Sequence, residues 1–107
     1  MKSVIAERKL LYSLAGSEIR NEFSIGIGVP YIVQEGMVDF SVGADGCYGC
    51  DISLQGLNEK CGEVYGADSL QAIDLASSAV EPFLKRLSSK YDLFYLSGEP
   101  YFDDEGS

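Results

Sequence analysis

The sequence predicts an α+β fold, in which an antiparallel sheet of about five or six short strands carries one long helix on one of its faces. Three observations support this prediction. Several segments with strand composition come first, one helical pattern follows them, and one more apolar segment follows the helix. The clearest strand segments alternate apolar and polar residues, and the helical segment has an apolar stripe wide enough to cover a sheet. The length of 107 residues suits one hydrophobic core and one domain.

The first two strands are predicted at Val4 to Leu14 and Arg20 to Ile27. The residues between them include an Ala-Gly-Ser sequence that suits a hairpin turn. From Phe23 to Ile27 every second residue is apolar, and a serine and a glycine stand between the apolar residues. This alternation indicates a strand with one face against the core.

Three further strands are predicted after Pro30, at Met37 to Val42, Tyr48 to Gln55 and roughly Cys61 to Tyr65. The first two of these strands are separated by a Gly-Ala-Asp-Gly sequence that suits a turn. The segment from Tyr48 to Gln55 has the strictest alternation in the chain, with apolar side chains on one face and polar side chains on the other. The segments Met37 to Val42 and Tyr48 to Gln55 are therefore expected to pair in the sheet with their apolar faces toward the core.

A helix is predicted to follow Asp68. The side chain of Asp68 can cap this helix, and Gln71, three residues later, can reach back as the partner in a capping box. Apolar residues then recur at helical spacing and form one stripe: Leu70, Ile73, Ala76, Val80, Phe83, Leu84 and Leu87. Pro82 cannot donate a backbone hydrogen bond, so the helix is expected to kink there or to restart with Pro82 as its first residue.

The last strand is predicted at Leu93 to Leu96, where apolar residues face both sides. If this strand lies at an edge of the sheet, it could pair with a second copy of the chain, giving a homodimer, or with a strand of a partner. Residues 1–98 are assigned to a single domain, and residues 99–107 to an acidic, flexible tail.

The chain is strongly acidic, because 17 Asp and Glu against 8 Lys and Arg give a formal net charge of −9. Between Glu35 and Glu81 the only basic residue is Lys60. The negative electrostatic potential of such a chain repels nucleic acid and anionic membranes and attracts basic proteins. A charged surface also serves solubility. No apolar run reaches the roughly 20 residues of a membrane helix. The first residues lack the pattern of a secretory signal, so a cytoplasmic location is expected.

The absence of histidine excludes Ser-His-Asp and Cys-His nucleophilic pairs and histidine-bound metals. The chain has no Gly-x-x-x-x-Gly-Lys loop for phosphate, and the glycines at Gly26 and Gly28 lack the third glycine of a dinucleotide site. Paired carboxylates could still act as acid and base, but 17 acidic residues make close pairs unavoidable. We therefore expect a protein that is not an enzyme and that holds no cofactor.

Cys47 and Cys50 have the Cys-x-x-Cys spacing of thiol redox sites and of half a zinc site, and Cys61 could add a further ligand. A structural zinc site needs four ligands, so the fourth would be a carboxylate such as Asp51 or a residue of another chain. On a regular strand, Cys47 and Cys50 point to opposite faces unless Gly49 introduces a bulge. We favour a core cysteine and a turn cysteine without metal, and keep a thiol or zinc site at these three cysteines as an alternative.

The stretch from Gly66 to Ala76, with the strand segment Cys50 to Leu57 before it, resembles a family of small bacterial domains of unassigned function. The similarity is best from Met37 to Leu87, and its motif is Gly-x-Asp-Ser-x-Gln-Ala, beginning at Gly66. Helix capping and packing explain this motif, so the resemblance implies a fold and names no active site. In size, acidity and lack of catalytic residues, the chain is also similar to bacterial immunity proteins, which neutralise toxins that are often nucleases.

We predict a binding protein that neutralises or regulates a basic protein partner, as a toxin-immunity protein does when it covers the cationic cleft of a nuclease. Seven tyrosines favour this function, because tyrosine offers rigid apolar contact area beside the acids. The predicted partner-binding residues are Glu35, Asp39, Asp51, Glu63, Tyr65 and Asp74. The alternatives are a small-ligand domain or a histidine-free enzyme with a pocket between helix and sheet, and the thiol or zinc site.

Overall fold

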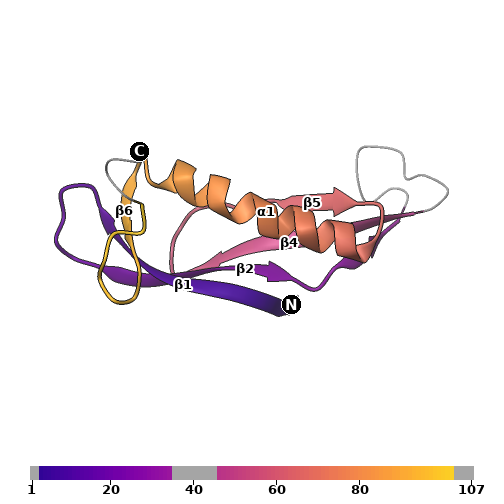
Figure 1. The fold of residues 1–107 in the computed structure, drawn as a ribbon, viewed down its shortest axis with the longest axis horizontal. Coiled ribbons are helices and arrows are strands. Elements are labelled where there is room, and N and C mark those ends of the chain that lie inside the picture. The colour runs from indigo at the N-terminus through magenta and orange to yellow at the C-terminus, as the bar shows by residue number, and fades with distance from the viewer. Residues whose placement is uncertain (1–2, 35–45, 103–107) are drawn as a thin grey trace.

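The computed structural model describes residues 3–34 and 46–102, and in these ranges it has one helix and a six-stranded sheet (Figure 1). The predicted α+β class is thereby confirmed. In chain order the elements are β1 (Val4–Leu14), β2 (Asn21–Gly28), β3 (Tyr31–Val33), β4 (Cys47–Gln55), β5 (Glu63–Gly66), α1 (Ser69–Leu87) and β6 (Tyr91–Phe94). Within these described ranges, no helix combines the length and the apolar character that a membrane span requires.

All paired strands of the sheet are antiparallel. β6 pairs with β1, β1 with β2 and β2 with β4, while β5 pairs with β4 along the opposite side of that strand. β3 also pairs with β4, and it continues the line of β2 after Val29 and Pro30. Between the pairs Ile27–Ile52 and Tyr31–Gly49 the β2–β3 side has one residue more than β4. This extra residue makes a bulge at the proline, where a regular ladder would need a backbone N–H that proline lacks.

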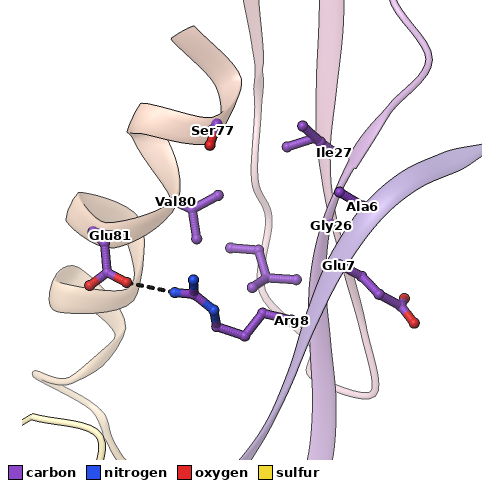
Figure 2. Close-up of a pocket in the computed structure, with 9 residues that line it drawn as sticks. Ala6, Glu7, Arg8, Gly26, Ile27, Ser77, Val80 and Glu81 are labelled. Atoms are coloured by element: carbon purple, nitrogen blue, oxygen red, sulfur yellow. Dashed lines mark hydrogen bonds and ion pairs between the residues drawn. The ribbon is translucent and has the colours of Figure 1, made fainter. Parts of the chain in front are cut away.

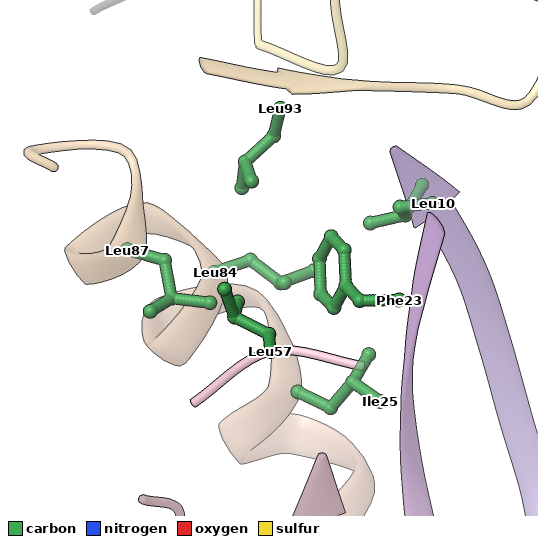
Figure 3. Close-up of a cluster of buried hydrophobic side chains, with 7 residues drawn as sticks. All are labelled: Leu10, Phe23, Ile25, Leu57, Leu84, Leu87 and Leu93. Atoms are coloured by element: carbon green, nitrogen blue, oxygen red, sulfur yellow. The ribbon is translucent and has the colours of Figure 1, made fainter. Parts of the chain in front are cut away.

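The helix α1 lies across one face of the sheet, over β5 and β4 and the near part of β2 (Figure 1). The main core lies between the second half of α1 and the sheet (Figure 3), and it consists of Leu10, Phe23, Ile25, Leu57, Leu84, Leu87 and Leu93. A second cluster under the first half of α1 is made of smaller residues, Ile27, Cys50, Ala72 and Ala76. Alanines at these positions let the helix approach β4 and β5 closely. Among the described residues, no helix lies on the opposite face of the sheet.

The start of α1 has the predicted cap. Oδ1 of Asp68 accepts a hydrogen bond from the backbone N–H of Gln71 at 2.8 Å. The side chain of Gln71 reaches back, as expected for a capping box, but it accepts from the backbone N–H of Ala67 at 2.5 Å and not from that of Asp68. Asp68 thus satisfies a donor that the first helical turn leaves without an internal acceptor, and Gln71 satisfies the N–H of the residue before the cap.

Replacing Asp68 with alanine is expected to lower the free energy of unfolding by about 1 kcal/mol, because the backbone N–H of Gln71 loses its hydrogen-bond acceptor. Asp74→Ala is the matched control, since Asp74 is an exposed residue of the same helix and the substitution removes the same charge. Its effect should stay within about 0.5 kcal/mol. Urea denaturation followed by circular dichroism measures both, and equal losses in the two variants would contradict the capping role.

At Pro82 the structure differs in part from the expectation. α1 is one continuous helix from Ser69 to Leu87 with Pro82 inside it, so the expected restart is not seen. Pro82 and Ser78 are both exposed, and the helical carbonyl that Pro82 leaves without a donor therefore lies where water can reach it. The expected kink stays a prediction.

Several predicted boundaries also change. β5 begins at Glu63, two residues later than predicted, and the strand predicted at Met37 to Val42 lies outside the described residues. The last strand is Tyr91–Phe94, and the chain turns immediately after it, with the N–H of Gly98 donating to the carbonyl of Tyr95 at 2.8 Å. The reason is burial, because Leu93 is buried whereas Leu96 is 54% exposed.

The first part of the predicted tail packs against β6. The backbone N–H of Tyr101 donates to the carbonyl of Leu93 at 2.9 Å, and that of Tyr95 donates to the carbonyl of Glu99 at 2.8 Å. The ring of Tyr101 packs on Tyr95 with 4.9 Å between ring centroids. Aromatic packing and these hydrogen bonds explain why the chain folds back here, and residues 103–107 lie outside the described ranges.

Candidate partner-binding surface

The face of the sheet opposite α1 carries a group of tyrosines and carboxylates. Directly opposite residues in an antiparallel sheet place their side chains on the same face. Gly49 in β4 lies opposite Tyr31 on one side and Tyr65 on the other, and Asp51 lies opposite Glu63. Tyr31, Asp51, Glu63 and Tyr65 are called the tyrosine–carboxylate cluster below.

The backbone of β4 explains how the cluster is built. Residues that alternate with the cluster, such as Cys50, point to the other face and pack under α1. Gly49 has no side chain, and the ring of Tyr31 occupies the space above it, since an added Cβ would lie 2.5 Å from Cζ of that ring. The glycine thus leaves room for an aromatic ring from β3 beside the backbone of β4.

Hydrogen bonds connect each tyrosine to a carboxylate. The hydroxyl of Tyr31 donates to Oδ1 of Asp51 at 3.3 Å, and the hydroxyl of Tyr65 donates to Oε1 of Glu63 at 3.0 Å. Desolvation and the carboxylates raise the pKa of both phenols, that of Tyr65 to about 12. Both hydroxyls therefore stay protonated at neutral pH and orient the carboxylates, each of which can accept several hydrogen bonds.

The structure brings together three of the six predicted partner-binding residues, Asp51, Glu63 and Tyr65. Asp74 lies apart from them, exposed on α1, which is on the other side of the sheet. The remaining two, Glu35 and Asp39, lie outside the described residues. Sequence reasoning missed Tyr31, which follows Pro30 in a strand of three residues; a Tyr-Ile-Val sequence after a proline was the available signal.

The three cysteines lie in different surroundings. Cys50 is fully buried, and its thiol donates to the carbonyl of Gly28 at 3.2 Å, so it is the expected core cysteine. Cys61 packs against the main core, and burial raises the pKa of its thiol to about 11. Cys47 lies at the start of β4 and is half-buried. Among the described residues, no three His, Cys, Asp or Glu side chains gather as a metal would require.

A hollow lies between α1, the first half of β1 and the second half of β2 (Figure 2). Apolar side chains such as Ile27 and Val80 line it, and at one end Arg8 donates to Oε1 of Glu81 at 2.7 Å. The hydroxyl of Tyr101 donates to the same carboxylate, which holds the C-terminal segment against this ion pair. The hollow has a volume of about 170 Å³, whereas pockets for small organic ligands usually measure roughly 300–1,000 Å³.

Comparison of the chain with protein-family models, curated proteins and solved structures finds no match. The resemblance to small bacterial domains of unassigned function therefore stays a prediction. The function has to be argued from the described residues themselves, and among these the tyrosine–carboxylate cluster is the group with the most distinctive chemistry.

Proposed function

We propose that the protein is a non-enzymatic binding protein that neutralises or regulates a basic protein partner, as a toxin-immunity protein of the nuclease-inhibitor type. The observation that carries this proposal is the tyrosine–carboxylate cluster on the face of the sheet opposite α1. It combines flat apolar rings with oriented negative charge on a rigid surface.

The chemistry of the cluster fits cationic side chains. A carboxylate accepts two parallel hydrogen bonds from an arginine guanidinium, and a tyrosine ring attracts a cation that lies over its face. Asp51 and Glu63 lie opposite each other on neighbouring strands, and tyrosines flank them on the same face. A partner that presents Arg or Lys beside an apolar surface would contact both kinds of group.

The net charge of −9 adds a long-range electrostatic attraction between the protein and a basic partner. Opposite net charges speed the encounter of two proteins by electrostatic steering, and salt weakens this effect. A nuclease has a cationic cleft because it binds phosphate, and a carboxylate pair can occupy such a cleft in place of the phosphates. This correspondence is why we propose the inhibitor class over a general acidic binding module.

Capture of the tagged protein's partners from a lysate of its own organism, first at low and then at high salt, identifies the partner. We expect one basic protein that is retained at low salt and released by high salt. Binding of that protein by Asp51→Asn with Glu63→Gln should then be at least about tenfold weaker, and less dependent on salt, because two attractive charges are removed.

Glu18→Gln with Asp92→Asn is the matched control, since both residues are exposed and lie outside the cluster, and the two substitutions remove the same two charges. Circular dichroism first shows that both double variants fold. Isothermal titration calorimetry at two salt concentrations then compares their affinities for the partner. If the two double variants lost the same affinity, net charge and not the cluster would explain binding. If neither lost affinity, the electrostatic proposal would be wrong.

A further inference from the structure

The sheet has one long edge that no described strand covers. β6 pairs with β1 only from Leu11 to Leu14. From Val4 to Leu10, β1 pairs with β2 on one side, and no described strand lies on its other side. This part of β1 is roughly 23 Å long at the usual rise of a strand, and it presents a row of backbone N–H and C=O groups to that side.

The other edges of the described sheet are shorter or protected. β5 has 4 residues, and the outer side of β6 is bridged by the returning C-terminal segment at Phe94 and Pro100. The bridge makes β6, the strand for which pairing with a second copy was predicted, the less suitable edge. β1 contains no proline, and its first residues Val4 and Ile5 are 39% and 48% exposed. Proteins protect a long open edge with charged residues and bulges, or cover it with another strand. β1 has a bulge between Val4 and Ala6 and the charged residues Glu7, Arg8 and Lys9, and these charges can also pair with the opposite charges of a second copy.

We propose that a second copy of the chain covers this edge, and that the two β1 strands pair antiparallel about a two-fold axis at Arg8, joining both sheets into one. A two-fold axis perpendicular to the sheet sets each residue of β1 opposite a residue whose side chain lies on the same face. The axis therefore passes between the two copies of one residue of β1, which lie opposite each other. The candidates near the middle of the open edge are Glu7, Arg8 and Lys9.

The charges of β1 select the register. An axis at Glu7 sets two carboxylates opposite each other, and an axis at Lys9 sets two ammonium groups opposite each other; both arrangements are unfavourable. An axis at Arg8 sets Glu7 of each copy opposite Lys9 of the other, which gives two ion pairs on the outer face. On the inner face each Arg8 brings its own counter-charge, because it is 2.7 Å from Glu81 of the same chain.

The surroundings of the edge are compatible with this pairing. α1 does not cover the first half of β1, and the hollow between them leaves the inner side of the edge open (Figure 2). The pairing would extend from Ala6 to Leu10, because at Leu11 the edge is already occupied by Phe94 of β6. The register shift in β1 between Val4 and Ala6 lets the first residues of each copy turn away from β6 of the other.

Sedimentation equilibrium of the full chain over about 1 μM to 1 mM tests the proposal, because an interface of this small size implies a weak dimer. We expect a monomer–dimer equilibrium, with slower amide exchange, as the dimer fraction rises, at those alternate residues between 6 and 10 whose N–H groups point away from β2. A chain that remains monomeric throughout this range would overturn the proposal. A dimer without added protection at residues 6–10 would overturn the assignment to this edge.

Charge reversal tests the register. Glu7→Lys and Lys9→Glu each create like-charged pairs across the axis and should abolish the dimer, whereas the two single variants mixed together should form a heterodimer, and the double swap should dimerise again. Glu18→Lys and Lys60→Glu make the same changes in net charge at exposed sites outside the strands, and they should dimerise as the unaltered chain does. Loss of the dimer in these controls, or its persistence in the single variants, would contradict the register.

Discussion

Leu84→Ala is expected to lower the free energy of unfolding by about 2–5 kcal/mol, which is a large share of the stability of a domain of this size. Leu84 is 0% exposed and lies at the centre of the main core, where Phe23 and Ile25 approach it from the sheet (Figure 3). Truncation removes apolar contacts and leaves a cavity that the surrounding strands and helix can fill only in part. Thermal unfolding should show a decrease in Tm of roughly 10 °C or more.

Leu70→Ala is the control for this prediction, because it makes the same chemical change in the same helix at a position that is 78% exposed. Its effect should stay within about 0.5 kcal/mol. Both leucines belong to the apolar stripe predicted from helical spacing, but only Leu84 is buried. The comparison therefore shows whether the loss of stability depends on burial or on membership of the stripe alone. Alanine has the higher helix propensity, so propensity cannot cause a loss in either variant. A similar loss in both variants would therefore mean that burial of Leu84 does not determine the cost of truncation.

The elements that were predicted well are those in which a local pattern and tertiary packing agree. β4 was predicted at Tyr48 to Gln55 and spans Cys47–Gln55, because its alternation matches a strand with one face under the helix. α1 begins where Asp68 predicted it to begin, since capping depends on residues that are neighbours in the sequence. Both patterns could be read without knowledge of the rest of the fold.

The elements that were missed or shifted depend on contacts between distant parts of the chain. β3 has three residues, too few for any periodic pattern, and it is a strand only because β4 lies beside it. The docking of Tyr101 follows from Leu93, Glu81 and Arg8, which lie on three different elements. No local pattern in the acidic C-terminal segment indicates these partners.

The candidate site could be predicted only in part, because some of its features follow from a local pattern and others from contacts between distant parts of the chain. The outward orientation of Asp51 followed from alternation in β4, but its pairing with Glu63 depends on the register of β5, which the connection after β4 sets. Tyr31 belongs to the cluster because of the bulge at Pro30 and because Gly49 provides space for its ring. Acidic composition alone placed Asp74 in the same group, although the sheet separates it from the cluster.

Gly56→Ala is expected to have a comparably large effect, about 2–5 kcal/mol, because two costs combine there. Gly56 ends β4 with a φ of +88°, and a Cβ at this position would lie 2.7 Å from the carbonyl oxygen of Glu22 and 3.3 Å from Cα of Phe23. Left-handed backbone is unfavourable for alanine, and backbone atoms of β2 cannot move aside as a flexible side chain can.

Gly16→Ala separates the two costs, since Gly16 has a nearly equal φ of +84° and nothing lies within 4 Å of its added Cβ. Its loss should be about 1–2 kcal/mol, from the backbone conformation alone. The excess loss in Gly56→Ala, measured by urea denaturation, then reports the close approach of β2 to the end of β4. Equal losses would show that β2 adjusts freely. A clear excess would mean that this contact fixes the chain between β4 and β5, and with it the register that holds Asp51 opposite Glu63.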